Sequence, residues 1–115
     1  MKVAVVGSRE YPDQEEVRVF VHNLPAGTII VSGGARGVDS WAAGAAADAG
    51  LDVDVKLPNY ELLGHFAPMA RNGEIVAVSD QMEAFWDGES RGTLDAIHKM
   101  LAAGKPVNVR VKRKS

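Results

Sequence analysis

Two short runs of consecutive apolar residues constrain the fold of this chain most. Residues 3–6 read Val, Ala, Val, Val and residues 29–31 read Ile, Ile, Val, so neither run alternates polar with apolar positions. A strand with one face in water alternates, whereas a strand covered by helices on both faces is apolar throughout. The two runs therefore predict strands of a parallel sheet buried inside an α/β domain.

Three weaker strand patterns and four helical patterns alternate along the rest of the chain. The further strands are expected at residues 53–57, 82–86 and 107–111. The helices are expected to start at Asp13, Val38, Pro68 and Thr93. Strands that alternate with helices imply right-handed crossovers between parallel strands. The predicted fold is a Rossmann-like three-layer α/β domain with a five-stranded parallel sheet in the order 3-2-1-4-5.

The chain is predicted to form a single domain, residues 1–111, followed by a basic tail, residues 112–115. The charges are distributed unevenly along it. Residues 1–104 carry 8 Lys and Arg against 15 Asp and Glu, a net charge of −7, whereas residues 105–115 carry 5 basic residues and no acidic one. We interpret the tail as a solubilising disordered end rather than a nucleic-acid contact.

Composition excludes several kinds of chemistry. The 115 residues include no cysteine, which excludes disulfides, a thiolate nucleophile and cysteine-based metal sites. The three histidines form no pair at metal-ligand spacing, so no metal site is expected. No apolar run approaches the ~20 residues of a membrane span. We expect a cytoplasmic protein with no metal, no cofactor and no membrane contact.

The loops that follow the strands carry the candidate functional residues. In an open α/β sheet the ligand crevice lies beyond the carboxyl ends of the strands, where the strand order reverses. Four loops expected near that edge each hold one arginine, namely Arg9, Arg36, Arg71 and Arg91. Arginine recognises phosphate and carboxylate groups with paired hydrogen bonds. The sequence therefore predicts a site for an anion, most simply the phosphate of a nucleotide.

Four motifs in these loops carry a family resemblance. They are Gly7-Ser8-Arg9, the segment Val-Ser-Gly-Gly-Ala-Arg-Gly-Val-Asp at 31–39, Arg71-Asn72, and Ser90-Arg91-Gly92-Thr93. Together they resemble the SLOG superfamily, which groups the Smf/DprA DNA-processing proteins with the LOG nucleotide hydrolases. The resemblance covers nearly the whole chain and is closest to the small, single-domain YspA-like branch of bacteria and their phages. It implies a Rossmann-like domain that binds a nucleotide or nucleotide-derived ligand, in a superfamily whose members often form homodimers.

The resemblance also assigns ligand-binding residues by position. One wall of the site consists of Gly7, Ser8 and Arg9, and a second wall of Gly33, Gly34, Arg36 and Asp39. The phosphate cradle at the start of the last helix consists of Ser90, Arg91, Gly92 and Thr93. Arg71 and Asn72 are expected to close over ribose or phosphate.

One departure from the LOG hydrolases bears on catalysis. Those enzymes carry a Pro-Gly-Gly-x-Gly-Thr-x-x-Glu signature, whereas the loop at 87–96 lacks the proline, is one residue longer and ends in Ala96 where the catalytic glutamate should stand. Asp95 is adjacent, but one residue along a helix rotates a side chain by about 100°. Hydrolysis of the LOG type is therefore kept as an alternative only, and no residue is assigned as catalytic.

Three functions follow in order of preference. The first is binding or sensing of a nucleotide or a nucleotide derivative. The second is hydrolysis of a nucleotide N-glycosidic or phosphate bond, with Asp39, Glu89 or Asp95 as acid or base. The third is single-stranded DNA binding of the DprA kind, against which the acidic body and an expected lack of exposed aromatic platforms argue. Nucleic acid is accordingly not expected as a partner.

Overall fold

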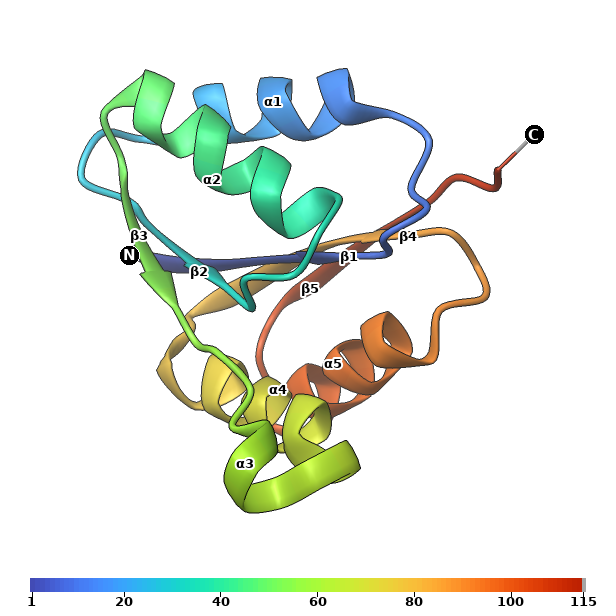
Figure 1. Cartoon of the computed structure of the whole chain (residues 1–115). Helices are drawn as coiled ribbons and strands as arrows, with labels where there is room; N and C mark the ends of the chain where they lie inside the picture. Colours follow the sequence, from blue (N-terminus) through green and yellow to red (C-terminus); the bar gives the residue numbers. More distant parts are fainter. Residues whose placement is uncertain (115) are drawn as a thin grey trace.

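Five parallel strands form one sheet in the order β3-β2-β1-β4-β5, as the sequence predicts (Figure 1). The computed structural model describes residues 1–114. The strands are β1 (Lys2–Gly7), β2 (Ile29–Ser32), β3 (Asp52–Val55), β4 (Gln81–Trp86) and β5 (Val107–Val111). The central strand β1 pairs with β2 on one side and with β4 on the other.

Helices cover both faces of this sheet. The helices α1 (Gln14–His22) and α2 (Val38–Ala49) lie on one face, and α4 (Ala67–Val78) and α5 (Arg91–Ala102) lie on the other (Figure 1). A one-turn helix α3 (Tyr60–Leu63) and a 3₁₀ turn η1 (Gly64–Phe66) connect β3 to α4. The domain therefore has the three layers that two-sided apolar strands require.

The apolar run in β1 divides between two cores. Val3 and Val5 pack with α1 and α2, whereas Ala4 and Val6 pack with α4 and α5. Phe85 of β4 lies in the first core with the rings of Tyr11 and Phe20 edge-on at 5.5 and 5.9 Å. Because successive side chains of a strand point to opposite faces, an uninterrupted apolar run fills both cores at once.

Local caps mark the start of the first helix and the end of the second. Asp13 caps α1 by accepting a hydrogen bond from the Glu16 amide at 3.1 Å. Glu16, three residues after Asp13, has the spacing of a capping box, in which its side chain would bond back to the Asp13 amide. Among the hydrogen bonds of residues 1–114, the Glu16 carboxylate accepts from the Tyr11 hydroxyl instead. Gly50 ends α2 at φ 73°, a left-handed conformation that glycine adopts without strain.

The connection to the third predicted helix differs from expectation. Pro68 lies in the first turn of α4, but α3 and η1 precede that helix. Asn59 starts the extra turn by accepting from the Leu62 amide at 3.1 Å, and Gly64 ends it at φ 55°. The same segment shortens the third strand, which ends at Val55 rather than at residue 57.

The last helix starts two residues earlier than predicted. It begins at Arg91 rather than Thr93, because the Ser90 hydroxyl caps it by accepting from the Thr93 amide at 3.4 Å. It ends at Ala102, close to the predicted stop at Gly104.

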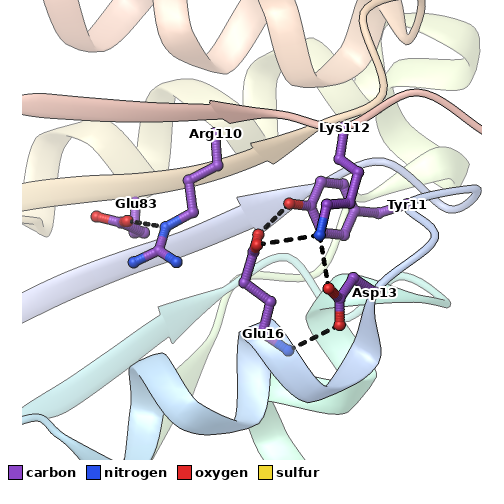
Figure 2. A network of polar contacts seen from close by, with 6 residues as sticks. All are labelled: Tyr11, Asp13, Glu16, Glu83, Arg110 and Lys112. Carbon is purple, nitrogen blue, oxygen red and sulfur yellow. Dashed lines mark hydrogen bonds and ion pairs between the residues drawn. The ribbon is translucent and has the colours of Figure 1, made fainter.

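Lys112, the first residue after β5, lies against the start of α1 (Figure 2). Lys112 extends the β4–β5 pairing through its amide, which donates to the Trp86 carbonyl, and its Nζ lies 2.7 Å from an Asp13 carboxylate oxygen. Lys114 pairs with Glu10 at 3.1 Å. Acidic residues at and just before the start of α1 thus supply ion-pair partners for these two lysines, and the solubilising disordered end stays a prediction. Ser115 lies outside the described residues.

None of the helices within residues 1–114 is both long enough and apolar enough to cross a bilayer.

Candidate functional site

A cavity of about 490 Å³ opens at the carboxyl edge of the sheet, where β1 and β4 lie side by side. Its volume lies within the range of small-molecule sites. Most of the residues assigned to the ligand site by resemblance line it: Gly7, Arg9, Gly33, Arg36, Asp39, Arg71, Asn72, Ser90, Gly92 and Thr93. The crevice therefore lies where the strand order predicts it.

Three assigned residues do not line the cavity. Ser8 is buried, and its hydroxyl bonds the Thr93 hydroxyl at 3.3 Å and accepts from the Asp87 amide at 3.1 Å. Gly34 forms a turn at φ +72°. Arg91 is exposed at the first position of α5. Three of the four predicted arginines therefore gather around one cavity, and Ser8 positions the β4–α5 loop instead of facing a ligand.

Two glycines let the loops around the cavity approach closely. A Cβ on Gly7 would lie 2.5 to 2.6 Å from the side-chain carbons of Val38 at the start of α2. A Cβ on Gly37 would lie 2.9 Å from the backbone of Arg9, and φ there is +77°. The loops after β1 and β2 are consequently in contact at this point, which brings Arg9 and Arg36 to one opening.

The three cavity arginines differ in their partners. Arg71 donates to the Gly33 carbonyl and, at 3.2 Å, to the Asn72 side-chain oxygen, so it joins α4 to the loop after β2. Arg9 and Arg36 are exposed and form no hydrogen bond or ion pair through their side chains within residues 1–114. Two guanidinium groups are therefore available to an anion in the cavity.

The start of α5 adds a second feature that favours an anion. The first turn of this helix holds no acidic residue, and Ser90, Gly92 and Thr93 line the cavity. The first N–H groups of a helix have no partner within it, and the helix dipole places partial positive charge there. A phosphate group bound at this position would meet both N–H donors and arginines.

Asp39 is the most buried carboxyl group that lines the cavity. It is 6% exposed, and one of its oxygens accepts from the Ala35 amide at 3.1 Å. Burial raises the pKa of Asp39 to about 6, although the hydrogen bond from Ala35 and the charge of Arg71 oppose that rise. A carboxyl group that titrates near neutral pH inside a cleft is a candidate acid or base.

The other two candidate acids lie outside the cavity. Glu89 is exposed and does not line it. The Asp95 carboxylate accepts hydrogen bonds from the Lys99 ammonium group at 2.6 and 2.7 Å and from the Asn72 side-chain nitrogen at 3.0 Å. Ala96, in contrast, does line the cavity. The position at which the LOG signature has its glutamate therefore faces the site in this chain but carries only a methyl group.

We expect the Asp39→Asn substitution to change how stability depends on pH. The pKa of Asp39 is higher in the folded chain than its ordinary value of 3.8, so its stabilising contribution is present at low pH and is lost as pH rises through about 6. Between about pH 5 and about pH 7.5 the wild type should lose roughly 1–2 kcal/mol of unfolding free energy that the variant keeps. Urea denaturation of both proteins at the two pH values measures this, and parallel pH dependences would contradict it.

Two cavity residues, and the exposure of two aromatic side chains, were not predicted from the sequence. Tyr60 of α3 and Asp87 line the cavity, and the Asp87 carboxylate accepts from the Ser90 amide at 2.8 Å. The expected lack of exposed aromatic residues is wrong, since Tyr60 and Phe66 are 56% and 61% exposed. The one-turn helix α3 and the turn η1 are too short to bury them. Aspartate often forms a turn by accepting hydrogen bonds from the backbone amides two or three residues later. The presence of Asp87 in the loop was therefore the one available sequence signal for this turn.

No group of three or more potential metal ligands of the His, Cys, Asp or Glu type lies together in the part of the chain from 1 to 114.

The fold and the cavity together define a class of protein. A five-stranded 3-2-1-4-5 sheet with arginine-bearing loops at the β1–β4 edge is a Rossmann-like domain of the SLOG superfamily, as the motifs predict. The family model described as DNA recombination-mediator protein A matches residues 1–59, and the chain belongs to this family. Membership of the YspA-like branch stays a prediction.

A phage protein and two solved structures are similar to the chain. The "Gene 61 protein" of Mycobacterium phage D29 is 35% identical, over 92% of this chain and 93% of that protein. DNA processing protein A from Helicobacter pylori, described for its single-stranded DNA binding mode, has a TM-score of 0.79 at 23% identity, with 98% of this chain and 66% of that chain covered.

The second structure is DNA processing protein A (DprA) from Streptococcus pneumoniae, with a TM-score of 0.73 at 22% identity. The match covers 94% of this chain but 49% of that one, so the chain spans about half the length of the streptococcal protein. At these identities the two structures support the fold.

Proposed function

We propose that this chain binds a nucleotide or nucleotide-derived ligand in the cavity, with a phosphate group held by Arg9, Arg36 and the start of α5. The observation that carries the proposal is the pair of arginines that line one cavity without side-chain partners among residues 1–114. Free arginines beside a helix N-terminus suit phosphate.

The rest of the cavity suits the uncharged part of such a ligand. Val6, Ile75 and Ala96 contribute apolar surface to its lining. A site with a few polar groups and an apolar wall is typical for small organic ligands. The charged and the apolar sides together favour a phosphorylated organic molecule over inorganic phosphate.

Binding is favoured over hydrolysis by the identity of the residues near the start of α5. Ala96 supplies no acid or base, and Lys99 neutralises Asp95. Of the three candidates predicted for proton transfer, Asp39 remains, since it is buried, lines the cavity and has a pKa of about 6. Hydrolysis of a nucleotide bond is therefore the alternative, with Asp39 as the acid or base.

Calorimetry with a panel of AMP, ADP-ribose, NAD and cyclic nucleotides tests the proposal. We expect at least one of them to bind and to be recovered intact when the mixture is analysed by chromatography. Release of free base or ribose phosphate would support the hydrolase alternative instead, and an Asp39→Asn variant would then stop it. Silence across the whole panel would refute the nucleotide proposal.

Single-stranded DNA binding is the second candidate, because the family and the Helicobacter pylori protein point to it. The exposed aromatic rings of Tyr60 and Phe66 remove one objection to it. The acidic body remains an objection, and Lys112 and Lys114 are already paired with acidic residues. Adding an oligothymidylate to the same calorimetric panel tests it: binding that survives deletion of residues 112–115 and weakens steeply with salt would support it.

The homodimer and the cytoplasmic location stay predictions from the sequence. Light scattering of the purified chain would measure the first.

A further inference from the structure

The segment that follows β3 exposes an unusual number of large apolar side chains. More than a third of the surface of each is in water, and the set is Leu57, Tyr60, Leu62, Leu63, Phe66 and Met69. The segment includes α3 and η1, which together are too short to bury an apolar face of their own. One of these six side chains, that of Tyr60, belongs to a residue that also lines the cavity.

Tyr60 combines exposure with contact to the cavity. It is 56% exposed and lines the cavity, whereas the other five exposed apolar residues of this described segment do not line it. Pro68 in the first turn of α4 lines the same cavity. An aromatic ring therefore borders the opening that Arg9 and Arg36 also border.

A helix cap and an apolar contact fix the backbone on both sides of Tyr60. Asn59 caps α3 by accepting from the Leu62 amide at 3.1 Å, which fixes Tyr60 as the first residue of that turn. Leu57 lies against Gly34, where a Cβ would come within 2.7 Å of its side chain. The segment is thereby attached to the loop after β2 that carries Arg36.

We propose that Tyr60 is the platform on which the base of a bound nucleotide stacks, so that the cavity selects nucleotides over sugar phosphates. This inference rests on the proposed function, because the arginines must hold the phosphate. Every nucleobase has a flat aromatic face, and stacking on a protein ring adds affinity without reading hydrogen bonds. A half-exposed ring at the cavity opening loses the rest of its water contact when a base covers it.

Calorimetry with AMP and ribose 5-phosphate tests the inference, because the two probes share the phosphate and the sugar and differ in the base. We expect the wild type to bind AMP about tenfold more tightly than ribose 5-phosphate. Tyr60→Ala should remove most of that difference and leave the affinity for ribose 5-phosphate unchanged. Tyr60→Phe should keep the AMP affinity within about twofold, since the ring face is retained. Phe66→Ala is the matched control, an exposed aromatic outside the cavity, and should change neither affinity.

The outcomes separate this inference from the proposed function. Equal binding of both probes by the wild type, or an equal loss of both in Tyr60→Ala, would overturn the stacking role and leave phosphate binding intact. No binding of either probe would overturn the stacking role, and silence of ADP-ribose, NAD and the cyclic nucleotides as well would overturn the proposed function. A Tyr60→Ala protein with unchanged AMP affinity but an altered mass in light scattering would overturn the stacking role as well, because the ring would then contact a second copy.

Discussion

Replacing both Arg9 and Arg36 by alanine is expected to lower the affinity of the chain for AMP by roughly 100-fold or more. Each guanidinium group lines the cavity and has no side-chain partner among residues 1–114, so each can bond a phosphate oxygen directly. A hydrogen bond to a charged group contributes about 1.5–3 kcal/mol. The free energies of two such bonds add, so their fold-changes in affinity multiply. Calorimetry of the double variant measures the loss.

The double variant should nevertheless remain folded. Both arginines are exposed and bond no other described side chain, so the melting temperature should stay within a few degrees of the wild type. Arg71 is a poorer choice for this test, because it also bonds the Gly33 carbonyl and would loosen the loop when removed.

A matched control removes the same charge elsewhere. Lys2 at the amino end of β1 and Arg18 on α1 do not line the cavity. Lys2→Ala with Arg18→Ala lowers the net charge by the same amount and should leave the AMP affinity almost unchanged. If this control loses as much affinity as the cavity variant, overall charge rather than the cavity attracts the ligand.

The Gly7→Ala substitution is expected to destabilise the fold by about 2–3 kcal/mol, which lowers the melting temperature by roughly 10 °C. The new Cβ would lie 2.5 to 2.6 Å from the side-chain carbons of Val38, far inside van der Waals contact. Val38 is fully buried in the core between α2 and the sheet, so it cannot move away into water. The start of α2 must shift instead.

Gly73→Ala is the matched control for this prediction. Gly73 lies within α4, and a Cβ there would meet no atom within 4 Å. Alanine in a helix is favoured over glycine by about 0.5–1 kcal/mol, so this variant should be at least as stable as the wild type. Thermal unfolding of both variants measures the contrast, and equal melting temperatures would show that the β1–α2 contact relaxes more easily than the geometry implies.

The sheet was predictable because its signal is local in the sequence. Val3–Val6 and Ile29–Val31 are apolar at every position, and only a strand covered on both faces explains that. The β5 bounds, Val107–Val111, agree with the pattern as well. The strand order followed from the alternation of strands and helices, which leaves few chain paths for a parallel sheet.

The segment after β3 was not predictable from the same signals. Leu62 and Phe66 are apolar and suggest a core, but they are exposed because Asn59 and Gly64 limit the helix to one turn. A helix of 4 residues completes little more than one turn, so no apolar repeat can identify it.

The segments that form the candidate site could be predicted from the sequence, but the side chains that face the cavity could not. The predicted positions of Arg9, Arg36 and Arg71 place them at one edge, and the cavity gathers all three, although Arg71 lies in α4 rather than in a loop. Arg91 belongs to an equally well-placed loop but is exposed outside the cavity, because it is the first residue of α5. Ser8 likewise packs beneath the site. Which side of a loop a residue occupies depends on the caps and turns around it, and these are tertiary features.

The central position of β1 also determines when the chain can complete its fold. The strand closest to the N-terminus is flanked by β2 on one side and by β4 on the other, where Val3 pairs with Gln81. During synthesis, an N-terminal segment through α2 can form the first core only without Leu51 and Phe85, and it leaves one edge of its most apolar strand unpaired. Such an edge is a site for aggregation until residues 81–86 arrive. Long-range pairing of this kind slows folding. The ion pairs of Lys112 with Asp13 and of Lys114 with Glu10 join residues 99 and 104 positions apart.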